Sequence, residues 1–258
     1  MTGQTPRLRM FAGPNGSGKS LLARQLSKEH GGPAGLFALH EFLNADNLQR
    51  DLSAARIDLN RFGLRLSREQ LAGQLQGLGR LPDSHPFFAA ARLEAGILQA
   101  PQAAVDSYVA ASLVDFLRME LLAVRRSFSF ETVMSHRSKV LFLAEAASWG
   151  YRTYLYFVAT ESAELNIRRV QSRVREGGHD VLPEKVIERY RRSLDLLPDA
   201  VAYARRAFIF DNSGAEPIWL AEYLPDGTRE LQLPPDRLPK WFRRALPGAD
   251  LESLQSPQ

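Results

Sequence analysis

The sequence predicts an α/β fold built on a doubly wound, mostly parallel sheet of about five strands, with a helical insertion and a C-terminal hairpin. Two observations predict it. Short apolar runs suited to buried strands alternate with longer segments of helical periodicity. A glycine-rich loop, residues 13–20, joins the first apolar run to the first helix. A length of 258 residues suits one domain spanning 1–258.

The glycine-rich loop has the spacing G-x-x-x-x-G-K-S of a phosphate-binding loop (P-loop). Small residues let successive backbone N–H groups point at phosphate oxygens, and the helix start adds its positive dipole end. Lys19 would reach the β- and γ-phosphates, and the Ser20 hydroxyl would bind Mg²⁺. We therefore expect ATP and Mg²⁺, since no N-K-x-D guanine motif is present. The candidate nucleotide-binding residues are Gly13, Pro14, Asn15, Gly16, Ser17, Gly18, Lys19 and Ser20.

The remaining elements follow in chain order. Strands are expected at residues 8–12, 36–43, 126–130, 151–158 and 207–210. Residues 50–125 read as a mostly helical insertion, with a capping box at 67–70 and helices at 86–98 and 101–125. A basic lid and helix are expected over 165–206, running on to residue 204, and a hairpin with a short helix over 216–258.

Two polar side chains, Asn44 and Asp46, follow the second predicted strand. Ligands bind at the carboxyl edge of open α/β sheets, so both are candidate substrate contacts. Asp46 is a candidate general base, able to accept a proton from a hydroxyl that attacks the γ-phosphate. Alternatively, Asp46 only caps a helix that begins at Asn47. Spacing alone does not separate these alternatives.

The third predicted strand delivers Glu131 and Thr132 to the same edge. A carboxylate there can hold a water bound to Mg²⁺ or orient a substrate hydroxyl. The alternative is a solvated glutamate at the end of a strand. After the fifth strand, Asn212 is a candidate contact for the adenine ring.

Two arginines of the basic segment, Arg169 and Arg173, are four residues apart and so share one helix face. Guanidinium groups pair with two oxygens at once and stay charged, which suits a lid over a transferred phosphate. A solvated basic helix face would produce the same pattern.

Composition limits the classes of function. The hydrophobic fraction of 45% is ordinary, and no run reaches the roughly 18 apolar residues of a membrane helix. The polar N-terminus carries no hydrophobic signal segment, which predicts a cytoplasmic protein. The formal charge is only +4, and the basic residues concentrate at 168–206. A phosphate lid explains them as well as a nucleic-acid groove does.

These motifs, in this order, resemble the zeta-toxin family of P-loop kinases. The resemblance rests on residues 12–20, 44–46, 130–132, 169–179, 189–194 and 211–214. It implies a P-loop kinase-like fold and a bacterial toxin that uses ATP and Mg²⁺ to phosphorylate the 3′-hydroxyl of a UDP-activated amino sugar, such as UDP-N-acetylglucosamine. It also implies an antitoxin partner.

Family roles carry over residue by residue. The resemblance makes Lys19 the essential loop lysine, Asp46 the catalytic base, and Arg169 with Arg173 the groups that stabilise the transferred phosphoryl group. The expected substrate-binding residues are Asn44, Asp46, Glu131, Thr132 and His179. The chain departs from the family at Val133 and Ser135, where the classical toxins carry threonine and arginine.

Two other functions fit the same residues. A kinase of another hydroxyl, on a nucleic-acid 5′ end or a dinucleotide such as NAD, would use residues 168–206 as a groove. From a different class, a nucleotide-gated binding protein would turn over ATP to drive a conformational switch.

Overall fold

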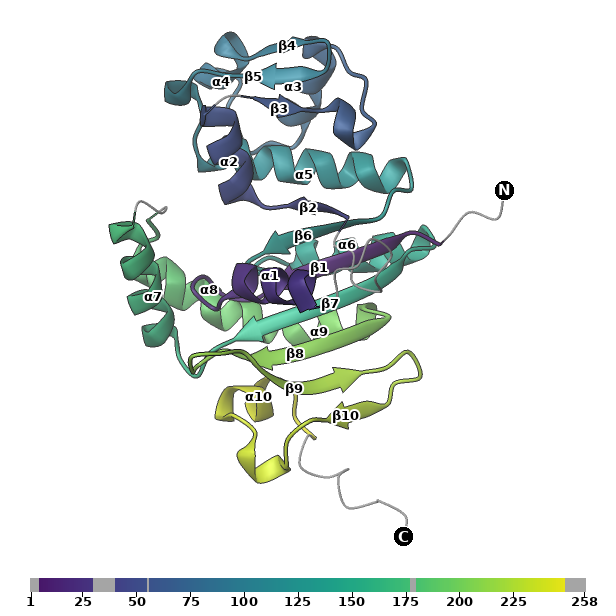
Figure 1. The fold of residues 1–258 in the computed structure, drawn as a ribbon, viewed down its shortest axis with the longest axis vertical. Coiled ribbons are helices and arrows are strands. Elements are labelled where there is room, and N and C mark those ends of the chain that lie inside the picture. Colours follow the sequence, from purple (N-terminus) through teal and green to yellow (C-terminus); the bar gives the residue numbers. More distant parts are fainter. Residues whose placement is uncertain (1–4, 30–39, 55, 177–179, 249–258) are drawn as a thin grey trace. The chain divides into compact units, whose positions relative to one another are not determined.

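The structure is a computed structural model that describes residues 5–29, 40–54, 56–176 and 180–248 (Figure 1). Contacts between residues divide the chain into two compact units. The first unit comprises Met1–Leu39 with Glu131–Gln258, and the second comprises His40–Phe130.

The first unit contains a five-stranded run in the order β10-β9-β8-β7-β1. Its strands are β1 (Arg7–Ala12), β7 (Arg152–Ala159), β8 (Arg206–Asp211), β9 (Ile218–Tyr223) and β10 (Arg229–Leu231). Strands β1, β7 and β8 pair in parallel, whereas β9 and β10 are antiparallel additions. The predicted α/β class, mostly parallel sheet and C-terminal hairpin are confirmed.

Helices cover both faces of these strands. They are α1 (Lys19–Glu29), α6 (Arg137–Ser148), α7 (Ala163–Arg175), α8 (Pro183–Asp195), α9 (Leu197–Tyr203) and α10 (Lys240–Ala245). Figure 1 shows α1 in front of β1 and β7, with α8 and α9 passing behind the sheet. The central strands read as continuous apolar runs because both faces are covered. Leu8, Met10 and Phe11 of β1 are fully buried.

The helical segment expected to run on to residue 204 is broken into α8 and α9. Pro198 explains the break, because proline has no N–H to donate to the carbonyl of Leu194. The short helix expected within residues 216–258 is present as α10. A further short 3-10 helix, η3, covers Pro235–Arg237.

The second unit pairs β2 (Glu41–Leu43) in parallel with β6 (Phe128–Thr132), of which Glu131 and Thr132 count with the first unit. Its helices are α2 (Ala45–Ala54), α3 (Arg68–Gly77), α4 (Pro86–Ala90) and α5 (Ser107–Ala123), with 3-10 helices η1 (Asn60–Phe62) and η2 (Gln102–Ala104). The helix predicted over residues 101–125 is present as α5, and its Leu113, Leu117 and Leu121 are fully buried. The capping box at Ser67 and Gln70 is confirmed.

The prediction of a helix over residues 86–98 is wrong beyond Ala90, where α4 ends. A three-stranded antiparallel sheet follows instead, in the order β3-β5-β4, from β3 (Ile57–Asp58), β4 (Arg92–Glu94) and β5 (Ile97–Gln99). Ala95 and Gly96 turn the chain with φ of 50° and 81°. The Gly96 carbonyl accepts a hydrogen bond from Leu59 N at 2.8 Å. The insertion is therefore a mixed α and β segment.

Among the described residues, no helix is both long enough and apolar enough to cross a membrane.

Candidate active site

The phosphate-binding loop lies between β1 and α1 and depends on glycine at two points of close approach. Gly13 has a φ of +142°, and a Cβ there would lie 2.0 Å from the carbonyl oxygen of Val158. Gly18 has a φ of +94°, and its Cβ would lie 2.0 Å from Nδ2 of Asn212. Any larger residue would push the loop away from the strand ends that support it. The G-x-x-x-x-G spacing is thus fixed by packing as well as by phosphate chemistry.

Asn212, directly after β8, holds the phosphate-binding loop in place by hydrogen bonds. Its Nδ2 donates to the carbonyl of Ser17 at 2.8 Å, and its backbone N–H donates to Ala159 at 2.8 Å. The side chain is only 3% exposed. Asn212 therefore holds the loop against β7, and its expected contact with adenine stays a prediction.

Three functional groups meet where the loop enters α1. The ammonium group of Lys19 donates to the carbonyl of Pro14 at 2.8 Å and lies 3.9 Å from Oε1 of Glu131. The hydroxyl of Ser20 donates to Oε2 of Glu131 at 2.8 Å. Lys19 is 7% exposed and Glu131 is 14% exposed, so water screens this pair less than it would at the surface. The carboxylate that follows the third predicted strand therefore lies on the phosphate-binding loop.

Thr132, the next residue, shapes the turn that leaves β6. Its Oγ1 accepts a hydrogen bond from the backbone N–H of Met134 at 3.1 Å. Met134 is buried and has a φ of 54°. This local bond fixes the turn; the expected substrate contact of Thr132 stays a prediction.

The other two polar residues from the β2 edge lie in the second unit. Asn44 is buried, and its Oδ1 accepts the N–H of Asn47 at 3.0 Å. Helix α2 begins at Ala45, with Asp46 exposed in its first turn. The alternative in which Asp46 caps a helix starting at Asn47 is therefore wrong, because Asn44 supplies that cap. The base role of Asp46 stays a prediction.

Arg169 of α7 contacts the loop that follows β8. Its Nη1 donates to the carbonyl of Asn212 at 2.6 Å, and its Nη2 donates to the carbonyls of Gly214 at 3.0 Å and Ser213 at 3.5 Å. One guanidinium group thus ties α7 to three consecutive carbonyls. Arg173 lies one turn further along α7 and is exposed. His179 lies outside the described residues.

Sequence reasoning missed the side chains that hold the loop after β8. Asp211 is buried, and its Oδ2 accepts from Nε1 of Trp241 at 2.6 Å and from the hydroxyl of Ser213 at 2.9 Å. Its Oδ1 accepts the N–H of Ser213 at 2.9 Å. An Asp two residues before a Ser at a strand end is an Asx-turn pattern that could have predicted the local bond. The contact with Trp241 is tertiary and leaves no local pattern.

A second set of hydrogen bonds fixes the segment that follows β7. The buried Thr160 donates its hydroxyl to Oδ1 of Asn166 at 2.7 Å, and its carbonyl accepts the hydroxyl of Tyr190 at 2.7 Å. Burial raises the pKa of Tyr190 to about 12, with the charges of Glu161 and Asp211 adding to the rise. The phenol therefore keeps its proton at neutral pH and remains a donor.

Residues 8–197 match a protein-family profile described as an AAA domain. The matched range holds the whole phosphate-binding loop, the second unit and helix α8. The chain belongs to this AAA-domain family. Among curated proteins, no sequence matches this chain.

Solved structures similar to this AAA-domain chain include two of the complex of AvrRxo1-ORF1 with ORF2. The structure with ATP has a TM-score of 0.53 and 15% identity, covering 89% of this chain and 61% of that chain. The structure with sulphate ions has a TM-score of 0.52 and 15% identity, covering 89% and 62%. The chain thus spans about three fifths of the length of these proteins. At this identity the likeness shows a shared fold alone.

The PezAT chromosomal toxin–antitoxin system of Streptococcus pneumoniae also matches, with a TM-score of 0.46 and 16% identity. The match covers 84% of this chain and 72% of that chain.

Proposed function

We propose that the chain is an ATP-dependent kinase that transfers the γ-phosphoryl group to the 3′-hydroxyl of a UDP-amino sugar of the UDP-N-acetylglucosamine type, acting as a bacterial toxin. One observation carries the phosphoryl-transfer part of the proposal: Ser20 and Lys19, at the start of α1, both contact the carboxylate of Glu131. A lysine, a hydroxyl and a carboxylate so arranged beside a phosphate-binding loop form the charged part of a phosphoryl-transfer site.

ATP fits the loop. Oδ1 of Asn15 and Oγ of Ser17 are buried and have no hydrogen-bond partner among the described residues. Buried polar atoms normally have a partner, so these two favour a polar ligand at the loop. Backbone N–H groups of residues 13–20 would take the phosphates, and Lys19 would exchange the Pro14 carbonyl for phosphate oxygens. One structural neighbour was itself solved with ATP.

Mg²⁺ also fits the residues present. The ion takes oxygen ligands, commonly one or two protein groups completed by phosphate oxygens and water. The Ser20 hydroxyl and the Glu131 carboxylate are such groups, and they lie 2.8 Å apart. When bound, the ion neutralises charge on the β- and γ-phosphates. Of the two roles open to Glu131, its contact with Ser20 favours the metal side over the acceptor side.

The remaining chemistry is assigned to side chains. Asp46 would accept the proton of the attacking hydroxyl, and Lys19 would stabilise the equatorial oxygens of the transferred group. Arg173 is exposed on α7, one turn from Arg169, and would be the lid arginine that contacts the γ-phosphate. Arg169 is engaged with carbonyls 212–214 and would position the loop after β8. Catalysis would then consist of positioning and electrostatics.

The acceptor and the partner rest on the zeta-toxin motifs. Asn44, Asp46, Thr132 and His179 are the proposed substrate-side residues, and an antitoxin protein is the proposed partner. The motifs also assign Glu131 to the sugar, but we propose it on the metal side because it contacts Ser20. Two of the structural neighbours are complexes of two proteins, AvrRxo1-ORF1 with ORF2.

Acceptor identity can be tested directly. The protein is incubated with ATP, Mg²⁺ and, one at a time, UDP-N-acetylglucosamine, UDP-glucose, NAD and a 5′-hydroxyl oligonucleotide. Mass spectrometry then looks for one added phosphoryl group on each. The proposal expects a product with UDP-N-acetylglucosamine, phosphorylated on the 3′-hydroxyl. Phosphorylation of NAD or of the oligonucleotide alone would contradict it.

A further inference from the structure

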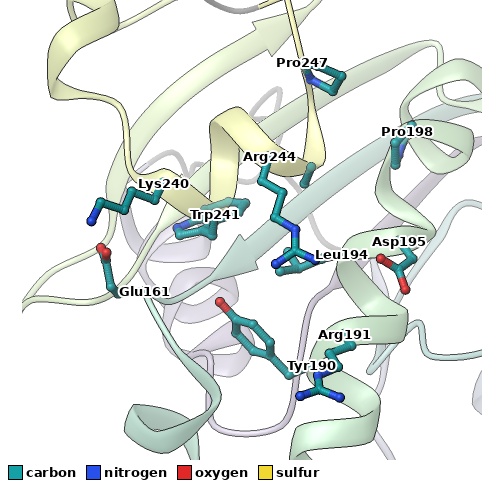
Figure 2. Close-up of a pocket in the computed structure, with 11 residues that line it drawn as sticks. Glu161, Tyr190, Arg191, Leu194, Asp195, Pro198, Lys240, Trp241, Arg244 and Pro247 are labelled. Carbon is teal, nitrogen blue, oxygen red and sulfur yellow. The ribbon is translucent and has the colours of Figure 1, made fainter.

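A cavity of about 630 Å³ lies between the helices α8 and α10 of the first unit (Figure 2). Its volume is within the range of pockets that hold small organic ligands, roughly 300–1,000 Å³. None of its lining residues belongs to the phosphate-binding loop, residues 13–20. The proposed kinase chemistry therefore leaves this cavity without a role.

The lining combines apolar walls with positive charge. Tyr190 and Trp241 provide aromatic surface, and Arg191, Lys240 and Arg244 provide cations. Figure 2 shows Arg244 extending from α10 toward α8, above the ring of Tyr190. Two carboxylates, Glu161 and Asp195, also line the cavity, so the cations remain in excess. A ligand that complements this lining has a flat apolar body and a negative charge.

Two aromatic residues that line the cavity, Tyr190 and Trp241, donate hydrogen bonds to the segments that follow β7 and end β8. The hydroxyl of Tyr190 donates to the carbonyl of Thr160, directly after β7. Nε1 of Trp241 donates to Asp211, which precedes the Asn212 that holds the carbonyl of Ser17. A ligand that moved either aromatic side chain would act on these supports. A chain of hydrogen bonds through the adjacent residues Asp211 and Asn212 thus connects the cavity wall at Trp241 to the phosphate-binding loop.

We propose that this cavity is a second ligand site, which binds a small planar aromatic anion and thereby changes nucleotide affinity at the phosphate-binding loop. Arg244 pairs with the negative group of the ligand, and Tyr190 with Trp241 contacts its flat body. By linkage, the nucleotide changes the affinity for this ligand by the same factor.

Binding can be tested with 1-anilinonaphthalene-8-sulfonate, an aromatic sulfonate that fluoresces in apolar pockets. The titration uses the whole chain, with a non-hydrolysable ATP analogue and Mg²⁺ at saturation. We expect saturable binding that Arg244→Gln weakens by about tenfold, because a charge-assisted contact is lost. Arg243→Gln is the matched control: Arg243 precedes Arg244 on α10 but does not line the cavity, so this variant should bind like the parent.

Three results would overturn the site: no saturable binding, an equal loss in both arginine variants, or complete displacement of the probe by the ATP analogue.

Coupling is measured by titrating the analogue with and without the probe. We expect a severalfold shift in the parent protein and a smaller one in Tyr190→Phe, which keeps the ring and the Trp241 contact but loses the bond to Thr160. An unchanged analogue affinity in the parent, or an equal shift in Tyr190→Phe, would refute the coupling. Both readouts are independent of phosphoryl transfer.

Discussion

At the scale of single residues, the proposed phosphoryl transfer depends on charges held at fixed points around the phosphate-binding loop. Lys19 is buried and anchored on the Pro14 carbonyl, beside the carboxylate of Glu131. Removing it takes away the charge proposed to face the β- and γ-phosphates. We expect Lys19→Ala to lower kcat by on the order of 10²–10³. Lys185→Ala, at an exposed lysine of α8, is the control and should keep the parent rate, with both read from ADP production. A Lys19→Ala enzyme with full activity would remove the lysine from the mechanism.

Asp46 is the residue on which the base assignment rests. Because asparagine accepts no proton at neutral pH, Asp46→Asn should lower kcat by roughly 10²–10³ while ATP affinity stays unchanged. Asp51→Asn, on the same helix α2, is the matched control, since Asp51 pairs with Arg50 at the surface. Steady-state kinetics and ATP titration separate the two effects. Near-parent turnover in Asp46→Asn would rule out the base role.

At the scale of elements, the phosphate-binding loop is held in place by β7 and β8. Gly18→Ala would place a Cβ 2.0 Å from Nδ2 of Asn212 at a φ of +94°. Either the loop or the Asn212 side chain that holds it must shift, so we expect ATP affinity to fall at least tenfold, as measured by calorimetric titration. Gly214→Ala meets no atom within 4 Å and should bind ATP as the parent does. Equal affinity in the two variants would contradict the packing argument.

The N-terminus of α5 gives a test of stability in the second unit. Oδ1 of Asp106 accepts the N–H groups of Tyr108 and Val109 at 2.9 Å each. Burial opposes the charge, but the Val109 bond and the His85 ring together hold the pKa of Asp106 below its usual 3.8. A lowered pKa contributes stability above the unfolded-state pKa, and this contribution is lost as pH falls through the folded-state pKa.

We therefore expect Asp106→Ala to lower the free energy of unfolding by about 1 kcal/mol at neutral pH, and by progressively less below about pH 4. Urea unfolding at several pH values measures both. Asp83→Ala, at an exposed loop residue, should change little. A loss that stayed constant down to strongly acidic pH would show that the carboxylate charge is not what caps α5.

The elements also show what a sequence can predict. Strands β1, β7 and β8 were predicted because buried parallel strands are continuous apolar runs, and the loop because its spacing is rigid. The sheet of β3, β4 and β5 was missed because its strands have only two or three residues each, too few to establish a period. The contacts of Arg169 with carbonyls 212–214 and of Trp241 with Asp211 join segments distant in sequence, so no local pattern reports them.

At the scale of the whole molecule, net charge is the property that bears on the class of acceptor. The formal charge of +4 does not choose between a nucleotide sugar and a nucleic-acid acceptor. Salt dependence does, because a protein that neutralises several phosphates of a nucleic acid releases their counterions, so that the complex binds far more weakly at high salt. The proposed small acceptor predicts a shallow dependence.

The central claim is that ATP turnover by this chain delivers phosphate to an acceptor. The most direct measurement is the molar ratio of phosphorylated UDP-N-acetylglucosamine to ADP formed in one reaction. The account predicts a ratio near one, with both products lost in Lys19→Ala. ADP formed in the presence of the acceptor without any phosphorylated sugar would contradict it and would favour a nucleotide-gated switch.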